Sequence, residues 1–263
     1  MQLPSMDALI DAAEAAAAVA GAVIRPLFRA GLAAELKGDQ SPVTLADRTA
    51  EQAMRAVLGQ RFPDHGILGE EFGLQNAAAP LRWVLDPIDG TRAFITGRPT
   101  FGTLIGLLHE DTPILGLIDQ CVTGERWIGA AGRATRFSGP FGGSIGCRPC
   151  PTLAEAELSC TTPEMFGPED SAWTRLAAAA RRISFGGDCY AYGLVALGQI
   201  DVIAEASLKV WDWAALVPVI EGAGGRLTDW NGEKLKPGAE GRSLAVGDPA
   251  LLAQAVRLLA GRD

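Results

Sequence analysis

The stretch Trp83-Val-Leu-Asp86-Pro-Ile-Asp89-Gly90-Thr91 decides how this chain folds and what it can bind. Its apolar start predicts a strand that ends at Asp86, because Pro87 cannot continue the hydrogen-bonded ladder. A tight turn after that strand would aim the carboxylates of Asp86 and Asp89 and the carbonyl of Ile88 at one point. Such an all-oxygen set suits Mg2+ or Mn2+. The same spacing is also compatible with a plain turn followed by a helix cap.

Gly90 and Thr91 follow this turn and predict the start of a helix. The first N–H groups of a helix have no partner within it, and its dipole is positive at this end. An anion such as phosphate binds well in that position. We therefore expect the backbone of these two residues to form a phosphate-binding site.

Four further acidic residues matter because they could join the same site. Glu70 and Glu71 follow an apolar strand, and adjacent carboxylates repel each other unless solvent or a cation separates them. Asp212 lies between two tryptophans at a helix start, and Asp47 lies in the first turn of a helix for which Thr44 is a candidate N-cap. A solvated strand end and ordinary helix-capping roles are the alternative interpretations.

The rest of the chain reads as a layered α/β or α+β protein. Expected helices span 5–30, 44–59, 171–182, 188–197, 211–221 and 249–260, and expected strands span 65–71, 82–86, 103–108, 114–121, 126–130, 157–161, 201–205 and 243–246. Residues 132–151 are rich in Gly and Pro, which predicts two sub-domains, 1–135 and 136–263. Pro218 is expected to kink the helix that contains it.

Composition excludes several classes of function. The chain of 263 residues has a net charge of −8 and no run of Lys and Arg, which argues against a nucleic-acid partner. No secretory signal or long apolar run is apparent, so no membrane partner is expected. Five cysteines, an odd number, favour reduced thiols in a cytoplasm, and the Cys147–Cys150 pair is interpreted as structural.

Taken together and in this order, the acidic motifs resemble the inositol monophosphatase family of the sugar-phosphatase superfamily. The resemblance runs through nearly the whole chain. It implies a five-layered αβαβα fold, a homodimer, and hydrolysis of a small phosphate monoester with two or three Mg2+ ions. Mn2+ could replace Mg2+, and Li+ is expected to inhibit.

The resemblance also implies roles for individual residues. The implied metal ligands are Glu70, Asp86, the Ile88 carbonyl, Asp89 and Asp212, with Glu71 a ligand or a near neighbour. Asp47 and Thr91, together with Glu70, would orient and deprotonate the attacking water. The backbone amides of Gly90 and Thr91 would hold the phosphate. The implied mechanism is in-line attack of a metal-activated water without a covalent phospho-enzyme.

Two stretches, 91–105 and 186–193, are similar to the histidinol-phosphatase branch of this family. Asp188 stands where inositol-type members tend to carry a small neutral residue, although it could also be a helix N-cap. With Glu205, it could bind a cationic amine through charge-assisted hydrogen bonds. Arg92 and Thr161 are further candidates for substrate contact, and Arg92 could equally be a surface residue.

The predicted activity is therefore that of a histidinol-phosphate phosphatase in histidine biosynthesis. The alternatives are an inositol-1-monophosphatase, a 3′,5′-bisphosphate nucleotidase, and a regulatory binding protein that has kept the fold. The complete set of acids and the negative charge argue against the last.

Overall fold

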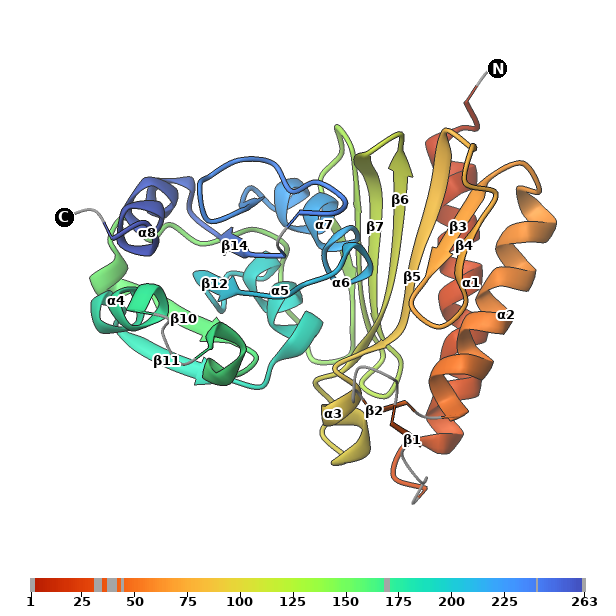
Figure 1. The fold of residues 1–263 in the computed structure, drawn as a ribbon, viewed down its shortest axis with the longest axis horizontal. Helices are drawn as coiled ribbons and strands as arrows, with labels where there is room; N and C mark the ends of the chain where they lie inside the picture. The colour runs from red at the N-terminus through yellow and green to blue at the C-terminus, as the bar shows by residue number, and fades with distance from the viewer. Residues whose placement is uncertain are drawn as a thin grey trace.

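A computed structural model describes residues 3–30, 35–36, 42–43, 45–167, 171–239 and 241–261. The chain forms alternating layers of helices and sheets in the order αβαβα, as predicted (Figure 1). Helices α1 and α2 cover one sheet, α5, α6 and α7 lie between the two sheets, and α4 and α8 cover the other side. The proposed N-cap Thr44 lies outside the described residues.

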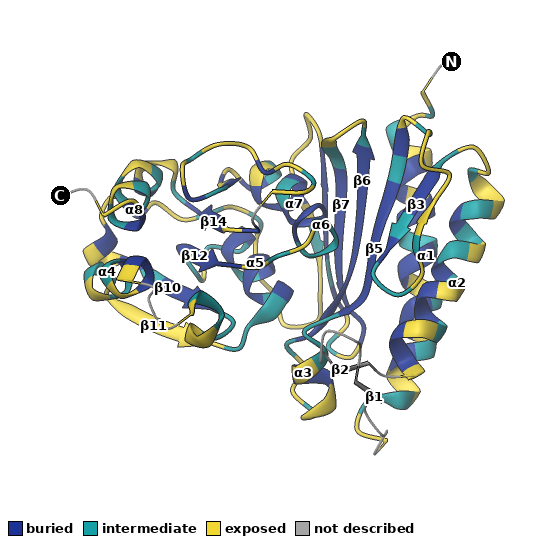
Figure 2. Ribbon diagram, in the orientation of Figure 1, coloured by how far each residue is buried: buried dark blue, intermediate teal, exposed yellow. Residues whose placement is uncertain are grey.

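The outer helices α1 (Met6–Leu27) and α2 (Leu45–Arg61) pack against each other and against the first sheet. Helix α1 begins after Ser5, whose hydroxyl accepts a hydrogen bond from the Ala8 N–H at 3.2 Å. Small alanines fill the buried face of α1, so this helix lies close to the strands (Figure 2). A short antiparallel pair, β1 (Glu35–Leu36) and β2 (Pro42–Val43), precedes α2.

The first sheet has seven strands in the order β4-β3-β5-β6-β7-β8-β9. Strands β3 and β5 run parallel, and every other neighbouring pair in this sheet is antiparallel. The carboxyl ends of β3 and β5 therefore meet at one edge, which brings Glu70 close to Asp86. The strands are β3 (Gly66–Gly69), β4 (Gly73–Gln75), β5 (Leu81–Asp89), β6 (Gly102–His109), β7 (Thr112–Gln120), β8 (Glu125–Ala130) and β9 (Arg136–Ser138).

The end of β5 differs from the prediction. The sequence predicts a strand that stops at Asp86, but β5 continues to Asp89 with a shift of register between these two residues. Pro87 lies within this irregularity, where its missing N–H is tolerated, and its carbonyl accepts a hydrogen bond from the Thr103 hydroxyl at 2.8 Å. Gly90 then turns the chain with φ of 84° into helix α3 (Thr91–Ile95).

The helix expected at 211–221 is two helices, α6 (Val210–Trp213) and α7 (Leu216–Gly222). The predicted kink at Pro218 is wrong because the break lies before it, at residues 214–215. Pro218 is in the first turn of α7, where a backbone N–H has no helical partner to lose. The third helix of this layer is α5 (Asp188–Ala196).

The second sheet has five strands in the order β11-β10-β12-β14-β13. Its strands are β10 (Glu157–Cys160), β11 (Arg182–Phe185), β12 (Val202–Glu205), β13 (Arg226–Thr228) and β14 (Ser243–Val246). Helices α4 (Ser171–Ala179) and α8 (Leu252–Leu259) cover it, and short 3-10 helices span Leu153–Glu155, Pro163–Phe166 and Pro249–Leu251. The helix predicted to reach residue 182 ends at Ala179, and β11 follows.

The division into sub-domains at 135/136 stays a prediction, and strand β9, which follows that point, still pairs with β8. All five cysteines are free thiols. Within the described ranges, no helix combines the length and the apolar character needed to cross a membrane.

Glycines allow the middle layer to lie close to the first sheet. A Cβ on Gly116 would lie 1.9 Å from the Ala215 carbonyl oxygen. We expect Gly116→Ala to lower the free energy of unfolding by about 1–3 kcal/mol, because backbone must move to admit the methyl group. Gly59→Ala is the matched control, since a methyl group at this position of helix α2 would have nothing within 4 Å, and it should stabilise by about 0.5–1 kcal/mol. Urea unfolding of both variants checks this, and equal effects would contradict it.

Candidate active site

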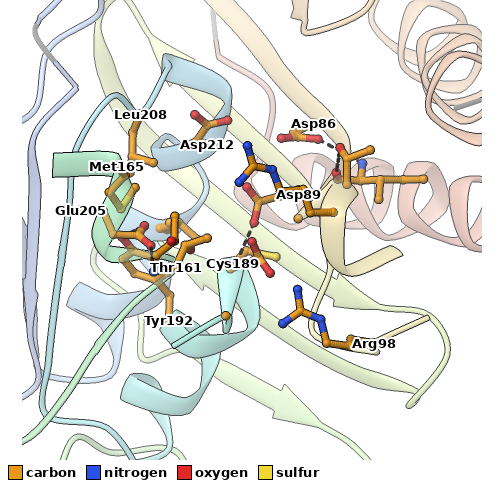
Figure 3. A pocket seen from close by; sticks show the side chains of 18 of the residues that line it. Asp86, Asp89, Arg98, Thr161, Met165, Cys189, Tyr192, Glu205, Leu208 and Asp212 are labelled. Carbon is orange, nitrogen blue, oxygen red and sulfur yellow. Dashed lines mark hydrogen bonds between the residues drawn. The ribbon is translucent and has the colours of Figure 1, made fainter. Parts of the chain in front are cut away.

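A cavity of about 530 Å³ opens where the two halves of the chain meet (Figure 3). Its lining comes from the carboxyl ends of β5 and β12, the start of α3, and the helices α5 and α6. Eleven of the predicted site residues line it, and they are Glu70, Asp86, Ile88, Asp89, Gly90, Thr91, Arg92, Thr161, Asp188, Glu205 and Asp212. Asp47 and Glu71 are not among its lining residues.

Three carboxylates gather at one side of this cavity. One oxygen each from Asp86, Asp89 and Asp212 lies within 4.8 Å of the others. Backbone N–H groups anchor all three: Ile88 donates to Asp86 at 3.0 Å, Cys189 to Asp89 at 2.6 Å, and Lys209 to Asp212 at 2.6 Å. The last bond is a helix-capping contact, so Asp212 both caps α6 and contributes to the acidic cluster.

Burial and mutual repulsion raise the pKa values of these carboxyls. The pKa of Asp86 lies well above its ordinary value because the group is buried and because Glu70, Asp89, Asp212 and Asp47 repel its charge. Burial likewise raises the pKa of Asp212 to about 7, against the opposing hydrogen bond from Lys209. A bound cation would remove this repulsion.

The cluster fits a divalent cation of the Mg2+ type. Two oxygens bound to one Mg2+ at about 2.1 Å each lie at most about 4.2 Å apart, close to the spread of the three carboxylates. The donors are all oxygen, which Mg2+ and Mn2+ prefer over nitrogen or sulfur. Glu70 adjoins the cluster, since its charge also raises the pKa values of Asp86 and Asp212.

The remaining residues of the predicted catalytic group surround the cluster. The Thr91 hydroxyl donates a hydrogen bond to the Ile88 carbonyl at 3.1 Å. Asp47 is 2% exposed on α2, and its charge reaches Asp86. Glu71 follows Glu70 beyond the end of β3, where its backbone N–H donates to Glu51 at 2.7 Å. The roles assigned to these residues stay predictions.

The helix that begins at the predicted phosphate site is short. Gly90 and Thr91 line the cavity, but α3 has only five residues. The dipole of so short a helix is weak, so individual N–H groups would have to hold an anion. Phosphate binding here stays a prediction.

A second acidic pair lies on the other side of the cavity. Glu205 is 3% exposed and accepts hydrogen bonds from the Thr161 N–H at 2.9 Å and the Tyr192 hydroxyl at 2.8 Å. Asp188 is the first residue of α5, after the N-cap Gly187, so it is not itself the N-cap. Burial and the charge of Glu205 raise the pKa of Asp188 to about 6, and Arg98 and Arg92 oppose this shift.

Asp188 also lies directly against Gly90, at the predicted phosphate site. A Cβ on Gly90 would lie 2.7 Å from Asp188 Cγ, so this carboxyl packs against the Gly90 backbone. Asp188 adopts φ of 44°, which is uncommon for a residue other than glycine. Unusual backbone conformations cluster at functional sites, and this one lies in the wall of the cavity.

Sequence reasoning missed several lining residues. Met165, Phe185 and Leu208 form an apolar part of the wall, and Tyr192 fixes Glu205. Phe185 ends β11, a strand that begins where the sequence predicts the end of a helix. The motif at residues 186–193 could have pointed to two of these lining residues, since Tyr192 lies within it and Phe185 precedes it.

Comparison with known proteins gives consistent matches. Residues 5–260 match the inositol monophosphatase family. The chain is 47% identical over 232 residues to the bifunctional phosphatase IMPL2, chloroplastic, of Arabidopsis thaliana, covering 87% of this chain and 66% of the plant protein. It is 36% identical over 207 residues to the histidinol-phosphatase of Mycobacterium tuberculosis, covering 75% of this chain and 78% of that protein.

Among solved structures, an inositol monophosphatase from Zymomonas mobilis superposes with a TM-score of 0.88 at 45% identity. The match covers 98% of this chain and 100% of the other.

The raised pKa of Asp212 predicts how the stability of the metal-free protein depends on pH. The value of about 7 in the folded protein exceeds the ordinary value of about 3.9, so this group lowers stability as the pH rises from about 4 to about 7. In EDTA at pH 8, we expect Asp212→Asn to be more stable than wild type by about 1–3 kcal/mol. The gain should shrink toward pH 5.

Thermal unfolding across this pH range measures the effect. Excess Mg2+ at pH 8 should stabilise wild type more than the variant, because only wild type keeps the third carboxylate. The Asn side chain can still accept the bond from Lys209, so helix α6 keeps its cap. A wild type that is more stable than Asp212→Asn in EDTA at pH 8 would show that the carboxylates do not repel each other.

Proposed function

The chain belongs to the inositol monophosphatase family and is a phosphatase, and from this premise we propose that it hydrolyses L-histidinol phosphate with bound Mg2+. The products are L-histidinol, an intermediate of histidine biosynthesis, and inorganic phosphate. The observation that carries this proposal is the carboxyl of Asp188, packed against Gly90 beside the proposed phosphate site. The similarity to a histidinol-phosphatase at 36% identity supports it.

The chain's own residues would hold the cation and the attacking water. Asp86, Asp89 and Asp212 would bind Mg2+ together with Glu70, the Ile88 carbonyl and, nearby, Glu71. When bound, Mg2+ would lower the pKa of water and offset the negative charge of the phosphate.

Asp47 and Thr91 would orient and deprotonate that water. Thr91 lines the cavity through its place at the start of α3, and the buried carboxylate of Asp47 adjoins the cluster. The water oxygen would form a bond to phosphorus as the ester P–O bond breaks, and the carboxylate of Asp47 would take the proton of the water, with Thr91 helping to orient that water. The departing alcohol oxygen takes a proton from solvent, and Glu70 orients the water.

Substrate geometry explains why Asp188 carries the proposal. In histidinol phosphate, the amine is on the carbon next to the one that bears the phosphate ester. A group that recognises this amine must therefore lie beside the phosphate. Asp188 is in contact with Gly90, and Glu205 adds a second negative charge nearby. A cationic amine between these carboxylates would form charge-assisted hydrogen bonds.

Other parts of the cavity would complete the substrate site. The apolar wall of Met165, Phe185 and Leu208 offers a surface for the imidazole ring. Thr161 holds Glu205 through its backbone N–H, and Arg92 and Arg98 would balance the charge of Asp188 when no substrate is bound.

The second candidate is hydrolysis of inositol 1-phosphate. It is favoured by the structural match at 45% identity to a protein described as an inositol monophosphatase. An uncharged polyol does not need the negative charges of Asp188 and Glu205, and for this reason we prefer histidinol phosphate. The predicted homodimer also stays a proposal.

A substrate comparison tests the proposal. We expect kcat/KM for histidinol phosphate to exceed that for inositol 1-phosphate and for adenosine 3′,5′-bisphosphate by about 100-fold, or roughly 2.7 kcal/mol. Phosphate release in Mg2+ measures this, and EDTA should abolish release from all three. A kcat/KM for inositol 1-phosphate equal to or above that for histidinol phosphate would favour the second candidate.

A charge-removing variant tests the role of Asp188. Asp188→Asn keeps the shape of the side chain but loses its charge, so KM for histidinol phosphate should rise about 10-fold or more. KM for inositol 1-phosphate should change less than about 3-fold. Asp111→Asn, on an exposed turn, is the control for net charge and should behave as wild type. Equal changes for both substrates would remove Asp188 from amine recognition.

A further inference from the structure

Helix α2 carries a second buried carboxylate, Glu51, which takes no part in the proposed chemistry. Glu51 is 0% exposed, although glutamate is almost never fully buried unless it is paired. It lies one helical turn after Asp47, on the face of α2 that packs against the first sheet. Such a residue needs strong partners, because an unpaired buried charge is very unfavourable.

Its partners are the backbone of the turn that carries Glu70 and Glu71. One oxygen of Glu51 accepts the Glu71 N–H at 2.7 Å, and the other accepts the Phe72 N–H at 3.3 Å. Arg55 donates to the second oxygen at 2.7 Å and also donates to the Gly73 carbonyl at 2.5 Å. The Glu51–Arg55 pair therefore holds the turn between β3 and β4 from residue 71 to residue 73.

Gly69, at the end of β3, leaves space for the side chain of Glu51. A Cβ on Gly69 would lie 1.9 Å from Glu51 Oε1 and 2.3 Å from its Cδ. Gly69 does not have a positive φ, so glycine is required here for space and not for its backbone conformation. On the opposite side, the Glu70 N–H donates to the Leu85 carbonyl of β5 at 3.2 Å.

We propose that Glu51, held by Arg55, is a positioning residue that aims the carboxylates of Glu70 and Glu71 at the divalent cation. The main chain of Glu70 is fixed by β5 on one side, and the next N–H is fixed by Glu51 on the other. Helix α2 thus contributes twice, with Asp47 beside the cluster and Glu51 beneath the turn. This inference rests on the proposed metal site but not on the identity of the substrate.

A carboxylate is required at position 51 because of the number of donors it serves. Two backbone N–H groups and one guanidinium N–H point at its two oxygens. Glutamine offers one acceptor oxygen and a donor NH2 group, so Glu51→Gln would leave one backbone N–H facing a donor. Alanine would leave all of them without this partner. We therefore expect Glu51→Ala to be more damaging than Glu51→Gln.

Binding of Mn2+ to the metal-free protein, measured by titration calorimetry, tests the proposal without relying on activity. Glu51→Ala should weaken Mn2+ binding about 10- to 100-fold, the usual effect of removing a group that orients metal ligands. Gly69→Ala should do the same although Glu51 is present, because its methyl group displaces the carboxylate. In the double variant, the second change should add little, since Glu51→Ala removes the clash.

Two controls on the same helix separate positioning from general destabilisation. Gln52→Ala changes an exposed neighbour, and Leu58→Ala removes buried apolar contacts two turns further on without touching the Glu70–Glu71 turn. Both should bind Mn2+ as wild type does at a temperature well below their unfolding.

In activity assays, Glu51→Gln should raise the Mg2+ concentration for half-maximal rate more than it changes KM at saturating Mg2+.

The outcomes distinguish this proposal from the proposed function. Wild-type affinity for Mn2+ in Glu51→Ala, or a loss of equal size in Leu58→Ala, would overturn the positioning role and leave the metal site intact. Additive losses in the double variant would also overturn it. Failure of the wild-type protein to bind Mn2+ would instead refute the metal site of the proposed function, and this inference with it.

Discussion

The parallel pairing of β3 with β5 is the constraint on which the site depends. It is the single parallel pair among the described strands of the first sheet, and it brings the carboxyl ends of both strands to one edge. Glu70 follows the end of β3 there, and Asp86 lies in β5 where its regular register with β6 ends. In an antiparallel pair, two such strand ends would lie at opposite edges. The register shift before Asp89 then turns the last carboxylate of β5 toward the second half of the chain.

Because buried carboxylates repel each other, several helices and strands are needed to hold them together in one site. The anchoring N–H groups for Asp86, Asp89 and Asp212 come from the end of β5, the start of α5 and the start of α6. No local segment could hold these charges together, since their pKa values are raised by burial and by neighbouring carboxylates. The site is thus formed only when both halves are folded against each other, and a cation that binds it also stabilises the fold.

Local signals in the sequence identify the layers and most of the site, because strand ends, helix starts and acidic motifs are encoded by neighbouring residues. Effects of distant packing are not encoded in this way. Pro87 predicts a strand end, but a bulge accommodates it, and Pro218 predicts a kink, but the break lies before it. Sequence reasoning missed Glu51 because its backbone partners, Glu71 and Phe72, lie 20 and 21 residues away. Its place on the apolar face of α2, between Ala50 and Met54, was a usable signal.

In the proposed function, recognition of the organic part of the substrate would depend on a single close contact. The proposed phosphate site includes Gly90, and Asp188 is packed against this residue in an unusual backbone conformation. Histidinol phosphate has an amine at the carbon where inositol 1-phosphate has a hydroxyl, so the two substrates differ at this point in charge more than in shape. A pocket that must distinguish them therefore needs charge beside the phosphate. Shape farther out, where Phe185 and Met165 form the wall, can add affinity for a ring but cannot replace that charge.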